Sequence, residues 1–255
     1  MSDELIDSHA HLLRLDVSPE EVLVEARDVG VQTVVNIGTD AEDSRRSAEL
    51  VSELSGVYTS VGIHPHNAGT YSATDLEDLL ELSEAPNVVA LGESGLDYYR
   101  SRWSRDIQVA LFEDMISLAN EVRLPLIIHS REAFGDTMAC LGNARTPIVL
   151  HCFEGGEAEV REAKERGYYI GLAGNVTYKN SETARVLRLM QEERLLVETD
   201  APYLSPQPMR GKPNAPKNVV YTARFIAERL GIEDGELAAL TVRNTREVFS
   251  LPTEA

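Results

Sequence analysis

The chain has 255 residues, 43% of them hydrophobic, so it is long enough to bury a sizeable core. It has no apolar run of membrane-spanning length, no signal-peptide pattern at its start and only two cysteines, which predicts a cytoplasmic protein without a disulfide framework. The net charge of −18 resembles that of proteins from salt-loving organisms, and taken over the whole chain it argues against nucleic-acid binding because carboxylates repel phosphates.

Short β-rich runs alternate along the chain with helical patterns. The first helix is expected to follow Ser18, a capping residue, with Pro19 at its first position and Gly30 after its end. Further helices are expected at 106–122, 157–166, 182–193, 217–230 and 234–248. Strands are expected at 5–9, 31–38, 57–63, 88–93, 124–129, 147–152, 168–173 and 195–199.

Eight strands that alternate with helices indicate a parallel α/β sheet. Strands such as 124–129 are apolar throughout, which is typical of strands covered on both faces. The count of eight favours closure, so we expect a (β/α)8 TIM barrel in a single domain over 1–255. The longest irregular stretch, 201–216, has five prolines and is expected to be functional.

Every histidine falls at the carboxyl end of a predicted strand. In a (β/α)8 barrel this edge carries the active site, whereas a purely structural role would scatter the imidazoles. The placement therefore predicts a metal centre. The histidines are His9, His11, His64, His66, His129 and His151.

The first four strands supply the first candidate ligands. His9 and His11 lie two positions apart, so both can bind one ion from a single strand. Two histidines after the third strand, His64 and His66, could bind metal, contact substrate or hold a loop. Substrate contact is favoured for His64, and no single role is chosen for His66. Glu93 is expected to project from the fourth strand into the barrel mouth, where a carboxylate can bridge two cations.

Later strands complete the candidate site. His129 and His151 each offer one more imidazole. The guanidinium of Arg131 can form a bidentate hydrogen bond with a phosphate or a carboxylate. Glu198 and Asp200 lie two positions apart, so their side chains are expected to point to the same side of the strand. Without a cation between them, the two carboxylates would repel each other. Asp200 is well placed to bind metal and to accept a proton from bound water.

Two windows without acids interrupt the acidic composition. Residues 201–227 carry a charge of +4, and residues 98–105 carry +3 together with two tyrosines and the only tryptophan. Arginines interleaved with aromatics are typical of surfaces that bind nucleic-acid strands. Because both windows follow metal-type motifs, we interpret them as substrate-binding, with contacts from Tyr98, Arg100, Arg210 and Lys212.

Six motifs stand in the order found in one family: Asp-Ser-His-Ala-His from position 7, Gly-Ile-His-Pro-His from 62, Gly-Glu-Ser-Gly-Leu-Asp-Tyr from 92, His-Ser-Arg from 129, His-Cys-Phe from 151 and Glu-Thr-Asp-Ala-Pro-Tyr-Leu from 198. The chain thus resembles the TatD family of metal-dependent deoxyribonucleases, which are amidohydrolase-like barrels. The resemblance implies a DNase that often works from the 3′ end, and two divalent ions, with Glu93 bridging them. The implied metal ligands are His9, His11, Glu93, His129, His151 and Asp200.

The implied mechanism is two-metal phosphodiester hydrolysis, with Asp200, Glu93 and His64 as catalytic residues. Imidazoles and carboxylates without thiolate suit Zn, Mn, Co or Mg. Asp200 would accept the proton of the attacking water, while His64 and Arg131 would hold phosphate oxygens. Family members commonly carry Asn-Glu-Pro after the eighth strand, where this chain has Ala215 as the middle residue, which bears on efficiency and substrate preference.

Two other functions fit parts of the pattern. A related hydrolase could cleave a C–N or ester bond in a small molecule, but the basic windows and the absence of lysine from predicted strands argue against it. A non-catalytic nucleic-acid-binding relic would have lost ligands, and none of the six is missing. The expected partner is DNA or another nucleic acid, with no membrane and no obligate protein partner.

Overall fold

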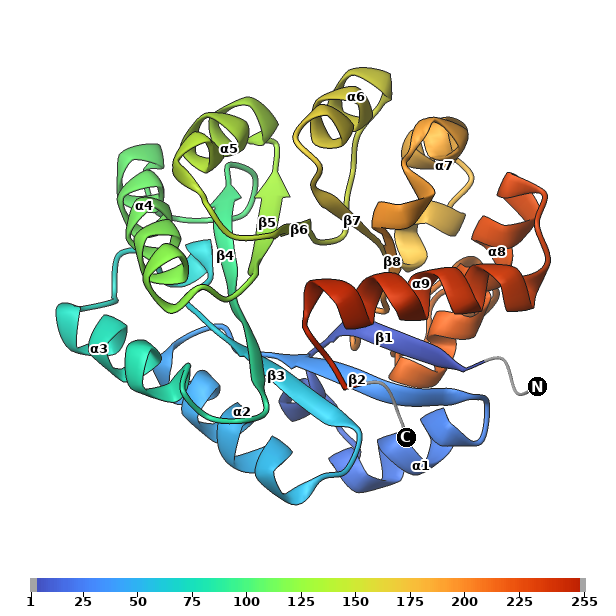
Figure 1. The fold of residues 1–255 in the computed structure, drawn as a ribbon, viewed down its shortest axis with the longest axis horizontal. Coiled ribbons are helices and arrows are strands. Elements are labelled where there is room, and N and C mark those ends of the chain that lie inside the picture. Colours follow the sequence, from blue (N-terminus) through green and yellow to red (C-terminus); the bar gives the residue numbers. More distant parts are fainter. Residues whose placement is uncertain (1–3, 253–255) are drawn as a thin grey trace. The chain divides into compact units, whose positions relative to one another are not determined.

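The computed structural model describes residues 4–252. Its contacts divide the chain into two compact units, and each is described by itself. The central unit is Ile37–His151; the terminal unit combines Met1–Asn36 with Cys152–Ala255. Both units are built from parallel strands connected through helices (Figure 1).

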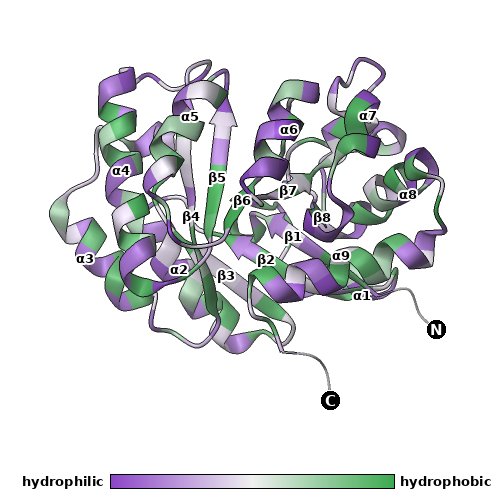
Figure 2. Ribbon diagram, turned by 45° about the horizontal axis from the view of Figure 1, so that its top comes forward, coloured by the Kyte–Doolittle hydropathy of each residue, from purple (hydrophilic) through white to green (hydrophobic). Residues whose placement is uncertain are grey.

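The central unit has four parallel strands that pair in chain order. They are β3 (Val57–Val61), β4 (Val88–Asp97), β5 (Leu126–Arg131) and β6 (Ile148–Leu150). A helix precedes each strand: α2 (Ala41–Glu53), α3 (Ala73–Leu82), α4 (Arg105–Val122) and α5 (Phe134–Cys140). Figure 2 shows both hydrophobic and hydrophilic colour along α4, as expected for a helix with one buried face.

The terminal unit also has four parallel strands. They are β7 (Tyr169–Leu172), β8 (Leu195–Val197), β1 (Leu5–Ala10) and β2 (Val31–Ile37). β7 pairs with β8 and β1 with β2, while a parallel bridge joins Ala10 of β1 to Ala201, just after β8. The helices are α1 (Pro19–Arg27), α6 (Glu157–Glu165), α7 (Thr183–Val186), α8 (Val219–Leu230) and α9 (Asp234–Val248).

The apolar strands form the core of each unit. All ten residues of β4 are buried, and so are Leu126, Ile127 and Ile128 at the start of β5. Burying an aliphatic side chain of this size contributes about 1.5–3 kcal/mol. The strands therefore form a rigid frame, and the residues at their carboxyl ends are held in place by it.

All eight predicted strands are present, with bounds close to those expected. The Ser18 side chain accepts a hydrogen bond from the Glu21 N–H, which confirms the predicted cap of α1. In contrast, the predicted helix at 182–193 is wrong beyond residue 186, because short 3-10 turns at Leu187–Leu189 and Glu192–Arg194 replace it. Among residues 4–252, no helix is both long and apolar enough to cross a membrane.

Candidate functional site

In the central unit, the carboxylate of Glu93 lies among three imidazoles. Its Oε1 is 2.8 Å from Nδ1 of His129, 3.6 Å from Nε2 of His64 and 3.7 Å from Nε2 of His151. These side chains come from β4, from β5 and from the segments that follow β3 and β6. We call His64, Glu93, His129 and His151 the central cluster. His64 and His151 follow the carboxyl ends of β3 and β6, whereas Glu93 and His129 lie within β4 and β5.

Two glycines allow the backbone around Glu93 to approach β5. Gly92 has φ 109° and Gly95 has φ 137°, which are conformations that side chains rarely adopt. A Cβ on Gly92 would lie 2.5 Å from the carbonyl oxygen of Ile127, and one on Gly95 would overlap the carbonyl oxygen of His129. The Gly-Glu-Ser-Gly motif is therefore explained by close packing of β4 against β5, which brings Glu93 to His129.

Asp97 links the central cluster to the turn after β4. Its Oδ2 lies 2.8 Å from Nε2 of His66 and 3.3 Å from Nε2 of His129, while its Oδ1 accepts the N–H groups of Tyr99 and Arg100. The sequence assigned no role to Asp97 and left the role of His66 undecided. The pairing with two imidazoles could not be read from the motif, because it depends on the register of β4 against β5.

Asp97 and His129 shift each other's ionisation. Burial alone would raise the pKa of the Asp97 carboxyl, but hydrogen bonds from His129, the Arg100 N–H and His66 hold it well below its usual range. Burial alone would lower the pKa of His129, but its bonds to Asp97 and Glu93 outweigh this and raise it to about 9. Metal binding through His129 must therefore displace a proton.

In the terminal unit, the Asp200 carboxylate lies beside two imidazoles. Its Oδ1 is 3.4 Å from Nε2 of His11 and 3.8 Å from Nε2 of His9. We call His9, His11 and Asp200 the terminal cluster. Asp200 adopts φ 56°, an uncommon left-handed conformation for a residue other than glycine. Its N–H donates to the carbonyl of His9 at 2.9 Å, which fixes the segment after β8 against β1.

Two buried side chains hold Asp200 in this conformation. Asp7 accepts hydrogen bonds from the Thr199 N–H at 2.8 Å and from its hydroxyl at 2.6 Å. Asn214 donates to the carbonyls of Thr199 at 2.9 Å and Tyr203 at 2.7 Å, on either side of Asp200. Burial raises the pKa of Asp7 to about 8, although the bonds from Thr199 act in the opposite direction. The sequence did not identify these supports.

Glu198 and Asp200 have different hydrogen-bond partners in the terminal unit. Oε1 of Glu198 accepts the Cys152 N–H at 2.6 Å, and its carboxylate packs against Gly171 of β7. β8 ends at Val197, and the left-handed backbone at Asp200 then turns the chain. Side-chain alternation therefore no longer applies beyond Val197.

The donors in both clusters suit divalent metal ions. Two ligand atoms on one ion, each about 2.1 Å from it, are roughly 3.4 Å apart in a tetrahedral site. Four of the donor pairs described above lie 3.4–3.8 Å apart. His64, Glu93 and His129 also have ligand atoms that all lie within 4.8 Å of one another. Imidazole and carboxylate donors are the ligands such ions prefer.

The six predicted metal ligands fall equally on the two units. The central cluster contains Glu93, His129 and His151, and the terminal cluster contains His9, His11 and Asp200. His64, which was favoured as a substrate contact, lies beside Glu93 in the central cluster. That both sets of three serve the same pair of ions stays a prediction from the family resemblance.

Aromatic rings in the first basic window lie under arginines. The guanidinium of Arg131 lies 4.7 Å from the ring centroid of Tyr99, and that of Arg105 lies 4.2 Å from the ring centroid of Tyr98. The Tyr98 hydroxyl also donates to Asp136 at 2.7 Å. The predicted substrate contact through Tyr98 therefore concerns a side chain that already has two partners, whereas Tyr99 is exposed.

The other predicted substrate contacts are exposed cations. Arg100 in the central unit and Arg210 and Lys212 in the terminal unit are all exposed. Arg210 lies 4.1 Å from the ring centroid of Tyr178. None of these three cations forms an ion pair with a carboxylate in the described part of the chain. Their charges are available to an anionic ligand.

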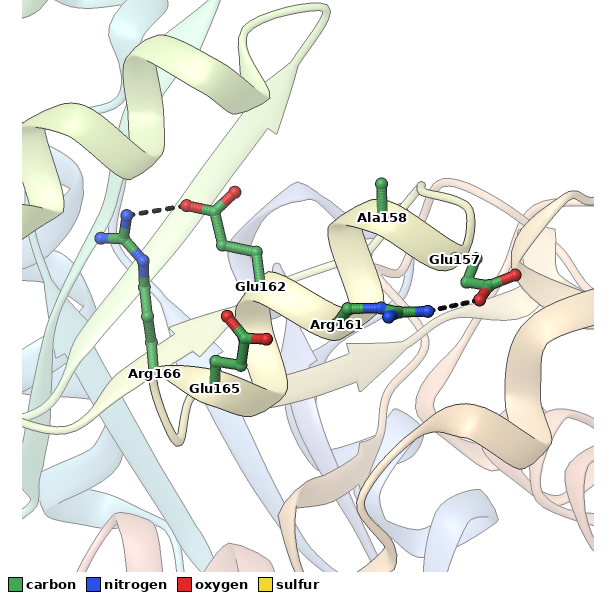
Figure 3. Close-up of a pocket in the computed structure, with 6 residues that line it drawn as sticks. All are labelled: Glu157, Ala158, Arg161, Glu162, Glu165 and Arg166. Atoms are coloured by element: carbon green, nitrogen blue, oxygen red, sulfur yellow. Dashed lines mark hydrogen bonds and ion pairs between the residues drawn. The ribbon is translucent and has the colours of Figure 1, made fainter.

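A hollow on α6 offers a contrast (Figure 3). Its volume is about 550 Å³, and its cations are neutralised within the helix: Arg161 pairs with Glu157 at 2.6 Å, and Arg166 pairs with Glu162 at 2.7 Å. These i,i+4 pairs stabilise a surface helix, and the carboxylate of Glu165 nearby adds negative charge. This hollow is therefore a poor site for a phosphate.

The chain is similar to known proteins over nearly its whole length. The chain is 38% identical over 253 residues to YabD of Bacillus subtilis, an uncharacterized metal-dependent hydrolase. The alignment covers 97% of this chain and 99% of YabD. It is 34% identical over 241 residues to the 3′-5′ ssDNA/RNA exonuclease TatD of Klebsiella pneumoniae, with 91% and 92% covered.

The crystal structure of YJJV, a TatD homologue from Escherichia coli, superposes with a TM-score of 0.91 at 30% identity and covers 99% of this chain and 100% of that one. The predicted (β/α)8 barrel of the metal-dependent hydrolase type is thereby confirmed. Residues 6–250 match the model of the family described as TatD related DNase. The chain belongs to this family of metal-dependent hydrolases.

Proposed function

We propose that the protein is a divalent-metal-dependent phosphodiesterase that degrades nucleic acid from the 3′ end. The observation that supports this most directly is the position of Glu93, whose Oε1 lies within 3.7 Å of three imidazole nitrogens. Such a group of donors binds cations, and the unpaired arginines and lysine of the basic windows suit a polyanionic substrate. The relatives named as 3′-5′ ssDNA/RNA exonucleases support the polarity.

The metal ligands in this proposal are His9, His11, Glu93, His129, His151 and Asp200, holding two ions of Zn, Mn, Mg or Co. When bound, divalent cations lower the pKa of water and stabilise negative charge on phosphate oxygens. Proton transfer and substrate binding are carried out by side chains of the protein. Asp200 accepts the proton from the attacking water, since its Oδ1 faces the imidazoles of the terminal cluster.

Substrate binding is assigned to the imidazole of His64 and to cationic side chains of both units. His64 and Arg131 hold nonbridging phosphate oxygens, because His64 lies beside Glu93 and Arg131 lies on the same strand as His129. Arg100, Arg210 and Lys212 attract the rest of the strand. Tyr98 is assigned a lesser role, in holding Arg105 and the turn after β4.

The test is cleavage of single-stranded DNA and RNA that carry a 5′ label, with Mn²⁺, Mg²⁺, Zn²⁺ or Co²⁺ and with chelator. We expect a ladder of products that shortens from the 3′ end, appears only with metal and disappears with chelator. A strand with a blocked 3′ end should resist cleavage. No metal-dependent cleavage of any strand, together with turnover of a small amide or lactone, would instead identify a small-molecule hydrolase.

A further inference from the structure

Tyr99 presents its ring to solvent in the turn that follows β4. Its exposed fraction is 59%, the largest among the large hydrophobic side chains of residues 4–252. A single exposed tyrosine needs no functional explanation by itself. Its surroundings are different from those of an ordinary surface residue, because a cation and a buried carboxylate both fix it in place.

The cation is Arg131, whose guanidinium lies 4.7 Å from the ring centroid of Tyr99. Arg131 has no carboxylate within ion-pair distance in the described part of the chain. The ring attracts the guanidinium through a cation–π contact on one side, and this contact leaves its positive charge in place. The pair offers a ring face beside an available positive charge, which suits a base with its neighbouring phosphate.

The carboxylate is Asp97, which holds the Tyr99 backbone and the central cluster together. Its Oδ1 accepts the N–H groups of Tyr99 at 2.9 Å and Arg100 at 2.7 Å, while its Oδ2 contacts His66 and His129. On the other side, Arg131 lies two residues beyond His129 on β5, a distance of about 7 Å along the strand. The ring is thus held at a fixed offset from the proposed metal ligands.

We propose that Tyr99 and Arg131 form a stacking platform for one base of a single-stranded nucleic acid, with the ring against the base and the guanidinium against a phosphate. This inference rests on the proposed function and deepens it. Every base has a π-face, so the platform selects for a strand that bears bases without selecting its sequence. It makes Tyr99 a determinant of substrate class, distinct from the residues assigned to catalysis.

The experiment compares a single-stranded oligonucleotide with a strand of equal length and charge that has abasic sites throughout. With Mn²⁺, Tyr99→Ala is expected to raise KM for the base-bearing strand about tenfold and to leave kcat within about twofold. Tyr99→Trp should restore the KM because it keeps an aromatic face. Neither variant should change cleavage of the abasic strand. Ile107→Ala, which alters another exposed apolar side chain of the central unit, is the matched control and should change nothing.

Binding of both strands, measured by fluorescence anisotropy in chelator, separates the platform from the hydrolysis. The wild type should bind the base-bearing strand more tightly than the abasic strand, and Tyr99→Ala should remove this difference. Equal effects of Tyr99→Ala on both strands, or none on either, would overturn the platform while metal-dependent cleavage still supported the proposed function. A base-dependent binding difference that needs Tyr99, without cleavage of any strand, would retain the platform and refute the hydrolysis.

Discussion

Asp7 and Thr199, which are 192 positions apart in the chain, are joined by two hydrogen bonds of 2.8 and 2.6 Å. Asp7 lies two residues before His9, and Thr199 directly precedes Asp200. The bonds therefore tie the strand that carries the imidazoles of the terminal cluster to the segment that carries its carboxylate. Asp7 is fully buried, so no water competes for these bonds.

Thr199→Val keeps the shape of the side chain and removes the hydroxyl that Asp7 uses. We expect the free energy of unfolding to fall by about 1–3 kcal/mol, because a buried carboxyl loses a hydrogen bond. Metal-dependent activity should fall as well, since Asp200 is then less firmly positioned. Urea denaturation in the presence of chelator measures the stability without any contribution from bound metal.

Thr74→Val, on the exposed face of α3, is the control and should change stability by no more than about 0.5 kcal/mol. If Thr199→Val were as stable and as active as the wild type, the bond between Asp7 and Thr199 would have no role in holding the terminal cluster.

Sequence patterns predicted helices and strands correctly where neighbouring residues alone determine the structure. The Ser18 cap and the apolar strands are set by neighbouring residues, and both are observed. The helix expected at 182–193 fails for a different reason. Thr183, Leu187 and Met190 are buried at helical spacing, but the short turns described above bury them equally well. Periodicity identifies the buried face, and it does not by itself establish a continuous helix.

The sequence located the histidines and acids that form the two clusters, but it did not identify the residues that hold them in place. His9, His129 and Glu93 could be placed because strand ends and motif order locate them. Asp97 and Asn214 act through hydrogen bonds to residues that only the folded chain brings near. The same is true of the left-handed backbone at Asp200, since nothing in the sequence marks that residue as one held at positive φ.

Glu93→Gln tests the central cluster. The amide keeps the size of the side chain and removes the charge that faces three imidazoles. We expect metal content to fall and activity to drop at least about a hundredfold, because even groups that only support metal ligands change activity by about 10–100-fold. Elemental analysis of the purified protein and cleavage rates across a metal titration measure the two effects.

Glu157→Gln on α6 is the matched control, since that carboxylate is exposed and pairs with Arg161 on the same helix. It should retain full metal content and activity. A Glu93→Gln protein that kept both would show that the central cluster is not a metal site.

Asn214→Ala tests the loop that holds Asp200. The buried amide donates to two backbone carbonyls and accepts hydrogen bonds from the Ala215 N–H and the Asn218 side chain, so its loss leaves several buried groups unsatisfied. We expect stability to fall by about 2–4 kcal/mol and kcat to fall with little change in KM. Asn180→Ala, at an exposed site in the same unit, should alter neither. An unchanged kcat in Asn214→Ala would show that this loop does not control the position of Asp200.

Arg210→Ala and Lys212→Ala test whether the second basic window contacts the phosphates of the substrate. Each cation that neutralises one phosphate of a single strand contributes about 0.7 to the slope of log Kd against log salt concentration. We expect each substitution to reduce that slope by about this amount, with equal effects on oligonucleotides of different sequence. The measurement is oligonucleotide binding in chelator from low to physiological salt. Arg161→Ala is the control, because Glu157 already neutralises that guanidinium, and it should leave the slope unchanged. A slope in Arg210→Ala and Lys212→Ala equal to that of the wild type would place the substrate strand away from this window.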